Sequence, residues 1–296
     1  MQECSISNTG RPAGKRNKTT ALLRDIGKYI LLLIAAFCFM MPILWFMTSS
    51  FRTNAEVFGN LNPFSLKMMF FGTYTLGNYR DIFVDYNFGT YVLNTVVVCI
   101  MTVTLGVLVA SMAGYAFAKM KFVGRKAMFL LVVFAIMVPF DAIAIPLYSI
   151  IIKLDWNNTY QALVLPTIAN GMVIFMFKQT FRDMDDALSE SAQLDGAGEF
   201  GIFFRIIMPI SIPAIISGAL ILFMAQWNAF MWPLLCARTV QFKMLQVALA
   251  DFSLEEGTEW SKLFAGITVA MTIPCCILMP FQKYYIRGIA TTGMKE

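Results

Sequence analysis

The side chains with the greatest capacity for chemistry lie inside otherwise apolar stretches of the sequence. Asp141 stands between two prolines, and Gln226, Trp227 and Asn228 form an uninterrupted run. Carboxylates and amides exchange hydrogen bonds with hydroxyl groups, and aromatic faces stack on ligands. Because polar groups inside membrane segments are costly and usually face a cavity, we expect these four side chains to line a polar path. Two alternatives stay open: Asp141 reaching water at the outer interface, and helix packing for the run at 226–228.

The sequence contains no recognisable catalytic apparatus. Histidine is absent, so the usual general base and the commonest metal ligand are missing. Neither an H-E-x-x-H pattern nor a G-x-S-x-G turn occurs, and the six cysteines have no zinc-site or disulfide spacing. Gly14-Lys15 resembles a phosphate loop only faintly, since the spacing is one residue short and no strand precedes it. We therefore expect a non-catalytic chain that binds no metal or cofactor itself.

The composition indicates a membrane protein. Of the 296 residues 58% are hydrophobic and only 14% are charged, with a mean hydropathy of +0.67, whereas soluble domains carry about 25% charged residues. Windows long enough to span a bilayer cover residues 27–49, 91–117, 127–151, 160–181, 211–236 and 264–285. We predict an all-α polytopic membrane protein with six transmembrane helices, comprising a basic tail at 1–26 and a transmembrane domain at 27–296. The first window is too long for the core of a cleaved signal peptide.

The distribution of positive charge predicts the orientation of these spans. Lysine and arginine dominate the N-terminal tail, the 118–126 loop and the C-terminal segment, whereas the 237–263 loop has more acids than bases. By the positive-inside rule both termini are cytoplasmic. The net charge of +5 is then an insertion signal, and no nucleic-acid partner is expected.

Two further patterns concern helix packing. Gly106, Ala110, Gly114 and Ala118 recur every fourth residue, which allows close approach of another helix in lipid. That helix could belong to this chain or to a second subunit. Prolines lie in or near several spans, and each removes a backbone hydrogen bond, a pattern more typical of a transport path than of a passive anchor.

Between the fourth and fifth windows lies an acidic, helix-forming island at 182–211. Three aspartates precede its first helical stretch, where negative charge complements the helix dipole. Gly196 permits a sharp bend, and a second helical stretch runs from Phe200 to Met208 before Pro209 and Pro213. We predict two short helices joined at the glycine, placed in the cytoplasm by the charge rule.

This island resembles the EAA loop of ATP-binding-cassette (ABC) importer permeases, in which Glu-Ala-Ala and a following Gly precede an Ile-x-x-x-Pro stretch. The matching residues are Glu190-Ser191-Ala192, Gly196 and the stretch around Pro209, with Ser191 replacing one alanine. Other segments resemble the sugar-importer branch, in particular the maltose-type second permease subunit. These segments are Ala113–Ala118 with Phe122–Arg125, Ile145–Tyr148, Trp227–Leu234, and Arg287-Gly288 with Gly293–Lys295.

The resemblance implies the ABC type I importer fold in a bacterial plasma membrane, surrounded by lipid. It also implies three protein partners: a second, different permease subunit, a dimer of ATPase subunits that binds ATP and Mg, and an extracellular or lipid-anchored solute-binding protein. The coupling loop, 182–211, would contact the ATPase through Glu190, Ser191, Ala192, Asp195, Gly196 and Ala197. The cargo would be a di- or oligosaccharide.

The resemblance implies less about the roles of the predicted path residues. Relatives usually have an acid after the Trp-Asn pair, where this chain has Ala229, so an acid-dependent role there is in doubt. In the maltose system the sugar contacts mainly the partner permease. The alternative function is a stand-alone ion-coupled carrier, which should show intramembrane charge relays, yet Asp141 is the one clear candidate for such a group.

Overall fold

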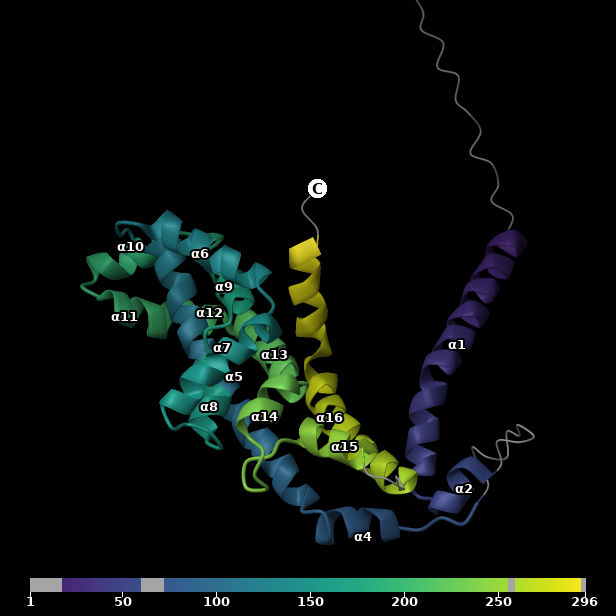
Figure 1. Ribbon diagram of the computed structural model, residues 1–296. Helices are drawn as coiled ribbons and strands as arrows, with labels where there is room; N and C mark the ends of the chain where they lie inside the picture. Colours follow the sequence, from purple (N-terminus) through teal and green to yellow (C-terminus); the bar gives the residue numbers. More distant parts are fainter. Residues whose placement is uncertain (1–17, 60–71, 255–258, 294–296) are drawn as a thin grey trace, which may run out of the picture.

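The computed structural model describes residues 18–59, 72–254 and 259–293, and all regular structure within them is helical (Figure 1). The predicted all-α class is confirmed. Residues 1–17 of the predicted basic tail lie outside the described residues, as do residues 60–71 of the loop between the first two predicted spans. The same holds for 255–258 and 294–296.

Three of the described helices are long and apolar enough to cross a membrane unaided. They are α1 (Lys18–Ser49), α5 (Phe88–Lys119) and α16 (Trp260–Gly293). Three bent pairs raise the number of candidate spans in the described residues to as many as six, if each pair forms one span. These pairs are α6 (Arg125–Met137) with α7 (Phe140–Lys153), Tyr160–Thr167 (α8 and η1) with α9 (Gly171–Arg182), and Glu199–Ile210 with α13 (Ile212–Trp227).

Three of the predicted spans are interrupted, and in the window 160–181 the break is a bend of 44° between Thr167 and Gly171. In the window 127–151, α6 and α7 meet at 103°, because Pro139 favours an extended conformation in the residue before it, and Val138 has a ψ of 116°. In the window 211–236, α13 ends at Trp227 and the short α14 (Met231–Cys236) follows. Pro233 inside α14 has no backbone N–H to continue the helical ladder.

Shorter helices join these elements. Among the described residues of 50–90 they are α2 (Asn54–Gly59) and α4 (Gly77–Val84), and α15 (Leu245–Leu254) precedes α16. The predicted island forms α10 (Ala187–Leu194), α11 (Glu199–Ile202), the π-helical turn η2 (Phe203–Ile207) and α12 (Met208–Ile210).

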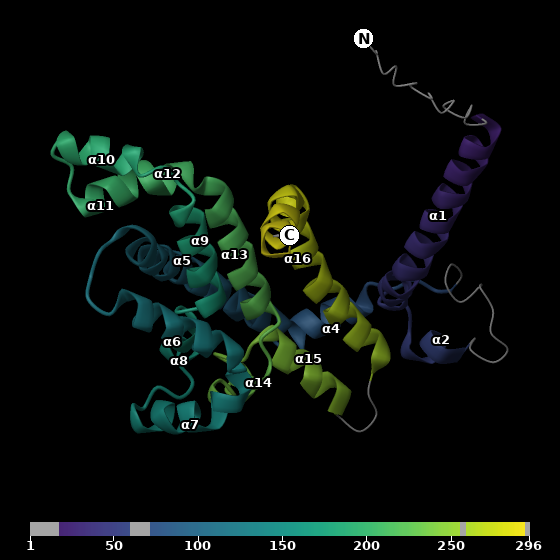
Figure 2. The same cartoon turned by 90° about the horizontal axis from the view of Figure 1, so that it is seen from above.

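The helices form a bundle from which α1 stands apart (Figures 1 and 2). Helix α5 packs against α9 and α13, and α16 packs against α13 and α15. Helix α1 meets α16 near its end, where the rings of Trp45 and Phe46 each lie 5.2 Å from the ring of Phe264. The side chains of its most apolar stretch are not buried, as expected of a surface that faces lipid or another subunit.

One end of the molecule carries α10, α11, the first described turns of α1 and the last turns of α16 (Figure 1). The opposite end carries α2 and α4. The charge pattern predicts such a common side for the termini and the acidic island, and its assignment to the cytoplasm stays a prediction.

The stripe of small residues on α5 packs inside this chain. A Cβ at Gly114 would lie 2.6 Å from Cβ of Phe177, and a Cβ at Gly106 would lie 2.8 Å from Cδ1 of Leu222. Ala110 between them is fully buried. The alternative left open by the sequence, contact with a second subunit, is therefore wrong for these three positions, because α9 and α13 already occupy that face.

Candidate functional site

The first candidate site is the α10–α11 hairpin, residues 187–202, which projects from one end of the bundle (Figure 1). The bend predicted at Gly196 is present, with φ at +82°. The N–H of Gly196 donates to the Gln193 carbonyl at 3.0 Å, and the N–H of Ala197 donates to the Ala192 carbonyl at 2.9 Å. This pair of bonds is a Schellman motif, and glycine is the residue that adopts its left-handed position without steric cost.

The outer surface of the hairpin combines negative charge with exposed apolar side chains. The segment 183–199 contains six acidic residues and no lysine or arginine, and Glu190 and Asp195 are exposed. Leu194 is 90% exposed and Phe200 is 68% exposed. These two side chains leave apolar surface beside the acidic groups that is open to contact with a partner.

The six predicted coupling residues divide between this surface and the interior. Glu190, Ser191, Asp195 and Gly196 are exposed, whereas Ala197 is half-buried and Ala192 is buried. Ala192 belongs to an apolar cluster that includes Phe181 and Ile202, so it anchors the hairpin. Neither Leu194 nor Phe200 is predicted as a contact residue from the sequence, although each is a large apolar residue flanking a glycine-containing turn.

The end of α5 holds both helices of the hairpin. Lys119 Nζ donates to the Met184 carbonyl at 2.6 Å and forms an ion pair with Asp186, the residue that precedes α10. Tyr115 Oη donates to Glu199 Oε2 on α11 at 2.9 Å, and Gln193 Nε2 donates to Glu199 Oε1 at 3.1 Å. Lys119 holds the pKa of the Asp186 carboxyl below its usual value by hydrogen bonding and charge attraction.

Sequence reasoning did not assign these contacts. In the sequence, Lys119 contributes only to the charge pattern that predicts orientation. Tyr115 lies in the stretch that resembles the sugar-importer branch, with no contact assigned to it. The partners lie 67 and 84 residues apart in the chain, so no local pattern indicates that they meet.

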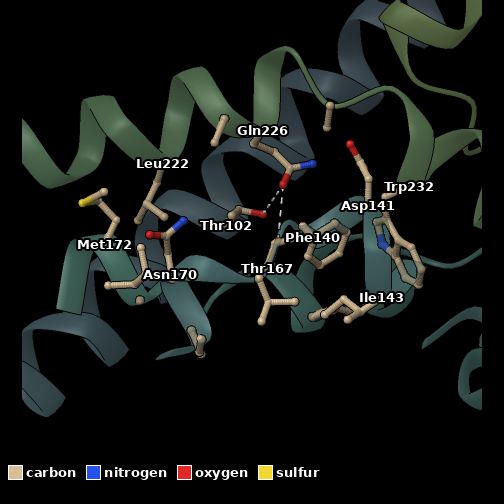
Figure 3. A pocket seen from close by; sticks show the side chains of 18 of the residues that line it. Thr102, Phe140, Asp141, Ile143, Thr167, Asn170, Met172, Leu222, Gln226 and Trp232 are labelled. Carbon is tan, nitrogen blue, oxygen red and sulfur yellow. Dashed lines mark hydrogen bonds between the residues drawn. The ribbon is translucent and has the colours of Figure 1, made fainter. Parts of the chain in front are cut away.

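The second candidate site is an open cavity of about 1240 Å³ lined by residues of α5, α6, α7, η1, α9, α13 and α14 (Figure 3). Its polar lining side chains are Thr102, Asp141, Thr167, Asn170, Gln226 and Asn228, and its aromatic ones are Phe140, Phe230 and Trp232. Asp141 is the one ionisable residue among the described residues that line it. Hydroxyl and amide groups combined with aromatic faces suit a neutral polar ligand.

Gln226 lies at the centre of a hydrogen-bonded bridge across this cavity wall. Its Oε1 accepts from Thr102 Oγ1 on α5 at 3.5 Å and lies 3.3 Å from Thr167 Oγ1 on η1 (Leu165–Thr167), whose hydroxyl also contacts the Val164 carbonyl at 2.9 Å (Figure 3). The residue is only 3% exposed, and its Nε2 has no hydrogen-bond partner among the described residues. A buried amide donor without a partner is costly and tends to mark a functional position.

The structure brings together three of the four predicted path residues. Asp141, in the first turn of α7, and Gln226 and Asn228 all line the cavity. Trp227 does not, because it is 2% exposed and its Nε1 donates to the Ala270 carbonyl on α16 at 3.2 Å. Adjacent helical residues point in directions about 100° apart, so Gln226 faces the cavity while Trp227 packs in the core.

The aromatic contribution to the cavity comes instead from residues that the sequence does not single out. Phe140 and Trp232 pack edge to face at 5.6 Å, and Trp232 Nε1 donates to the Ala162 carbonyl at 2.9 Å. Each lies where a predicted span is broken, since Phe140 follows Pro139 and Trp232 precedes Pro233.

Comparison with known proteins matches residues 103–290 to the family described as "Binding-protein-dependent transport system inner membrane component". The chain is 35% identical to the arabinooligosaccharides transport system permease protein AraQ of Halalkalibacterium halodurans, over 88% of this chain and 92% of that protein. It is 30% identical to the trehalose/maltose transport system permease protein MalG of Thermococcus litoralis, over 92% of this chain and 98% of that protein.

A solved structure of a bacterial ABC transporter involved in alginate import has a chain with the same fold. The TM-score is 0.78 at 20% identity, covering 93% of this chain and 99% of that chain. The predicted ABC importer permease fold is thus confirmed.

Proposed function

Because this chain belongs to the family of inner membrane components of binding-protein-dependent transport systems, we propose that it is the permease subunit of an ABC importer for carbohydrates. It spans the membrane several times and forms part of the path along which the sugar crosses. It has no catalytic site of its own, and the work for transport reaches it from a separate ATPase subunit.

The observation that carries this proposal is the α10–α11 hairpin. A chain without an ATP-binding motif presents six acids at 183–199 with Leu194 and Phe200 exposed beside them, on a compact projection at one end of the bundle. Such a projection would gain apolar burial and charge pairing in the cleft of a basic partner. An ATPase subunit that closes on ATP, with Mg, fits this role.

The cavity supports a neutral di- or oligosaccharide as the cargo. The described residues that line it supply amides, hydroxyls and aromatic rings and include no lysine or arginine, so an anionic sugar would meet a carboxylate without a compensating cation. Relatives named for arabinooligosaccharides and for trehalose/maltose agree with a neutral sugar.

The importer would contain further chains. A solved alginate transporter is in complex with a periplasmic protein that carries an alginate pentasaccharide, which supports a solute-binding protein as a partner here. A second, different permease subunit would complete the path, and a pair of ATPase subunits would bind the two coupling loops. In this arrangement the hairpin and both termini face the cytoplasm.

An ion-coupled carrier is the competing function. It has less support because Asp141 is the one ionisable residue among the described residues lining the cavity, whereas carriers of that class need chains of titratable groups.

Uptake by proteoliposomes containing this chain, the second permease and the ATPase, supplied with the binding protein, tests the proposal. Arabinooligosaccharides, maltose and trehalose serve as neutral probes, and an alginate oligosaccharide serves as the anionic one. We expect uptake of a neutral probe that requires internal ATP and persists when proton and sodium gradients are abolished. Uptake driven by a gradient without ATP would refute the importer, and uptake of the alginate probe alone would refute the neutral cargo.

A further inference from the structure

We propose that α5 is the element that carries movement of the α10–α11 hairpin to the cavity, and that Lys119 is the positioning residue that fastens the two together. This inference rests on the proposed function. It adds a route between the hairpin and the cavity.

At the hairpin end, two residues one turn apart on α5 hold both short helices. Lys119 is only 9% exposed in its side chain, and its ammonium is held by Asp186, the N-cap of α10, and by the carbonyl of Met184 two residues earlier. Tyr115 holds Glu199 at the start of α11. Because Glu199 also accepts from Gln193 of α10, a displacement of either short helix pulls on the same end of α5.

Between its ends, α5 is built to move as one body. It is a single helix from Phe88 to Lys119 with no proline inside, whereas the predicted spans 127–151 and 211–236 are broken. Two of its glycines leave no space against the neighbouring backbone: a Cβ at Gly114 would lie 2.9 Å from the Lys178 backbone nitrogen, and one at Gly106 would lie 3.3 Å from the Ile168 carbonyl oxygen. Close-packed contacts of this kind transmit displacement with little compression.

At the cavity end, α5 presents Thr102, which is buried and donates to Gln226 (Figure 3). At a rise of about 1.5 Å per residue, Thr102 lies roughly 25 Å along the helix from Lys119. The Thr102–Gln226 hydrogen bond is long, and Nε2 of Gln226 has no partner among the described residues. A shift of α5 can therefore break this bond and let the Gln226 amide form different hydrogen bonds. The amide could then turn its donor toward the cavity.

The hairpin has two covalent connections: residues 183–186 join it to α9, which packs along α5 and shares its displacement, and the connection to α13 is a less direct route. It passes through the π-helical turn η2, through Pro209 and through a bend of 83° before α13 begins. Each of these interrupts the regular helical hydrogen-bond ladder. A push on the hairpin therefore bends this connection more readily than it bends α5.

The test replaces Lys119 by methionine, which keeps the apolar stem and removes the charge. Lys121→Met is the matched control, since Lys121 is an exposed lysine two residues further on. The complete importer is reconstituted with its binding protein and with the neutral sugar that the unmodified complex transports fastest. Three quantities are measured: assembled complex, ATP hydrolysis stimulated by the binding protein, and sugar transported per ATP.

For Lys119→Met we expect normal assembly, ATP hydrolysis within about twofold, and sugar per ATP reduced by about tenfold or more, a typical size for a lost coupling between sites. Lys121→Met should match the unmodified complex. Exchange of the two charges in Lys119→Asp with Asp186→Lys should restore part of the loss seen in Asp186→Lys alone.

Two results would overturn the inference while leaving the proposed function intact. One is an unchanged amount of sugar per ATP in Lys119→Met. The other is a fall in uptake and hydrolysis in proportion to lost complex, which would make Lys119 a purely structural residue. Absence of ATP-dependent uptake in the unmodified complex would instead refute the proposed function, and this inference with it.

Discussion

Substitution of Gly196 tests whether the shape of the hairpin turn is needed for transport. Gly196 has φ at +82° and Gly198, two residues later, has φ at −77°. Apart from the glycine itself and its two neighbours in the chain, no residue lies within 4 Å of a Cβ built at either position. The two sites differ chiefly in backbone strain, which makes Gly198 a suitable control, although Gly198 is also the N-cap of α11, where valine is less favourable than glycine.

The magnitude follows from the left-handed backbone. An L-residue in that region costs about 1–2 kcal/mol, with β-branched residues at the upper end. That cost is a factor of about 5–30 in a local equilibrium, set against the two Schellman hydrogen bonds of 3.0 and 2.9 Å. For Gly196→Val we expect membrane insertion at the normal level and uptake reduced at least fivefold, with Gly198→Val near the unmodified level.

The assay compares initial uptake rates with the amount of chain in the membrane and the amount of ATPase subunit recovered with it. Gly196→Asp adds a further carboxylate to the acidic turn, and we expect it to abolish uptake while insertion persists. Equal uptake by Gly196→Val and Gly198→Val, or normal uptake by Gly196→Asp, would refute the coupling role of the turn.

Three further predictions concern separate parts of the chain. Leu194→Ser should leave the stability of this chain within about 0.5 kcal/mol, as for other surface changes, yet reduce recovery of the ATPase subunit; Val123→Ser, at a side chain that is 99% exposed, is the control, and equal recovery with both would argue against docking through Leu194. Asn228→Ala should change the relative uptake rates of several sugars, because Asn228 lines the cavity; an unchanged profile would favour packing. Gly114→Ala should destabilise the purified chain by about 1–3 kcal/mol through overpacking against α9, whereas Gly27→Ala, with open space around it, should not; equal melting temperatures would refute the close packing.

The sequence indicates the span positions better than their shapes. Apolar composition over about 20 residues is a local property, so each window is visible without a structure. The break at Pro139 is also predictable from the local sequence. The angle of 103° between α6 and α7, which places residues of both helices in the cavity lining, depends instead on what the two helices pack against. The number of apolar residues says nothing of that angle.

The candidate site shows the same division. The acidic island and its glycine bend follow from residue types at fixed spacing, and the bend at Gly196 is present as predicted. The contact surface of Leu194 and Phe200 and the fixing of Asp186 by Lys119 do not follow, since they depend on which side chains the folded bundle leaves exposed and which it places side by side.

By itself the sequence determined the helical class, the membrane environment and the existence of a compact acidic hairpin, because hydropathy, charge and a glycine at one turn act over a few residues. Only the tertiary structure decided that Trp227 packs in the core while Gln226 and Asn228 reach a cavity. It also decided that the small residues of α5 pack against this chain's own helices. The physical reason is that both questions concern residues far apart in sequence, whose meeting is set by the packing of whole helices and not by any local pattern.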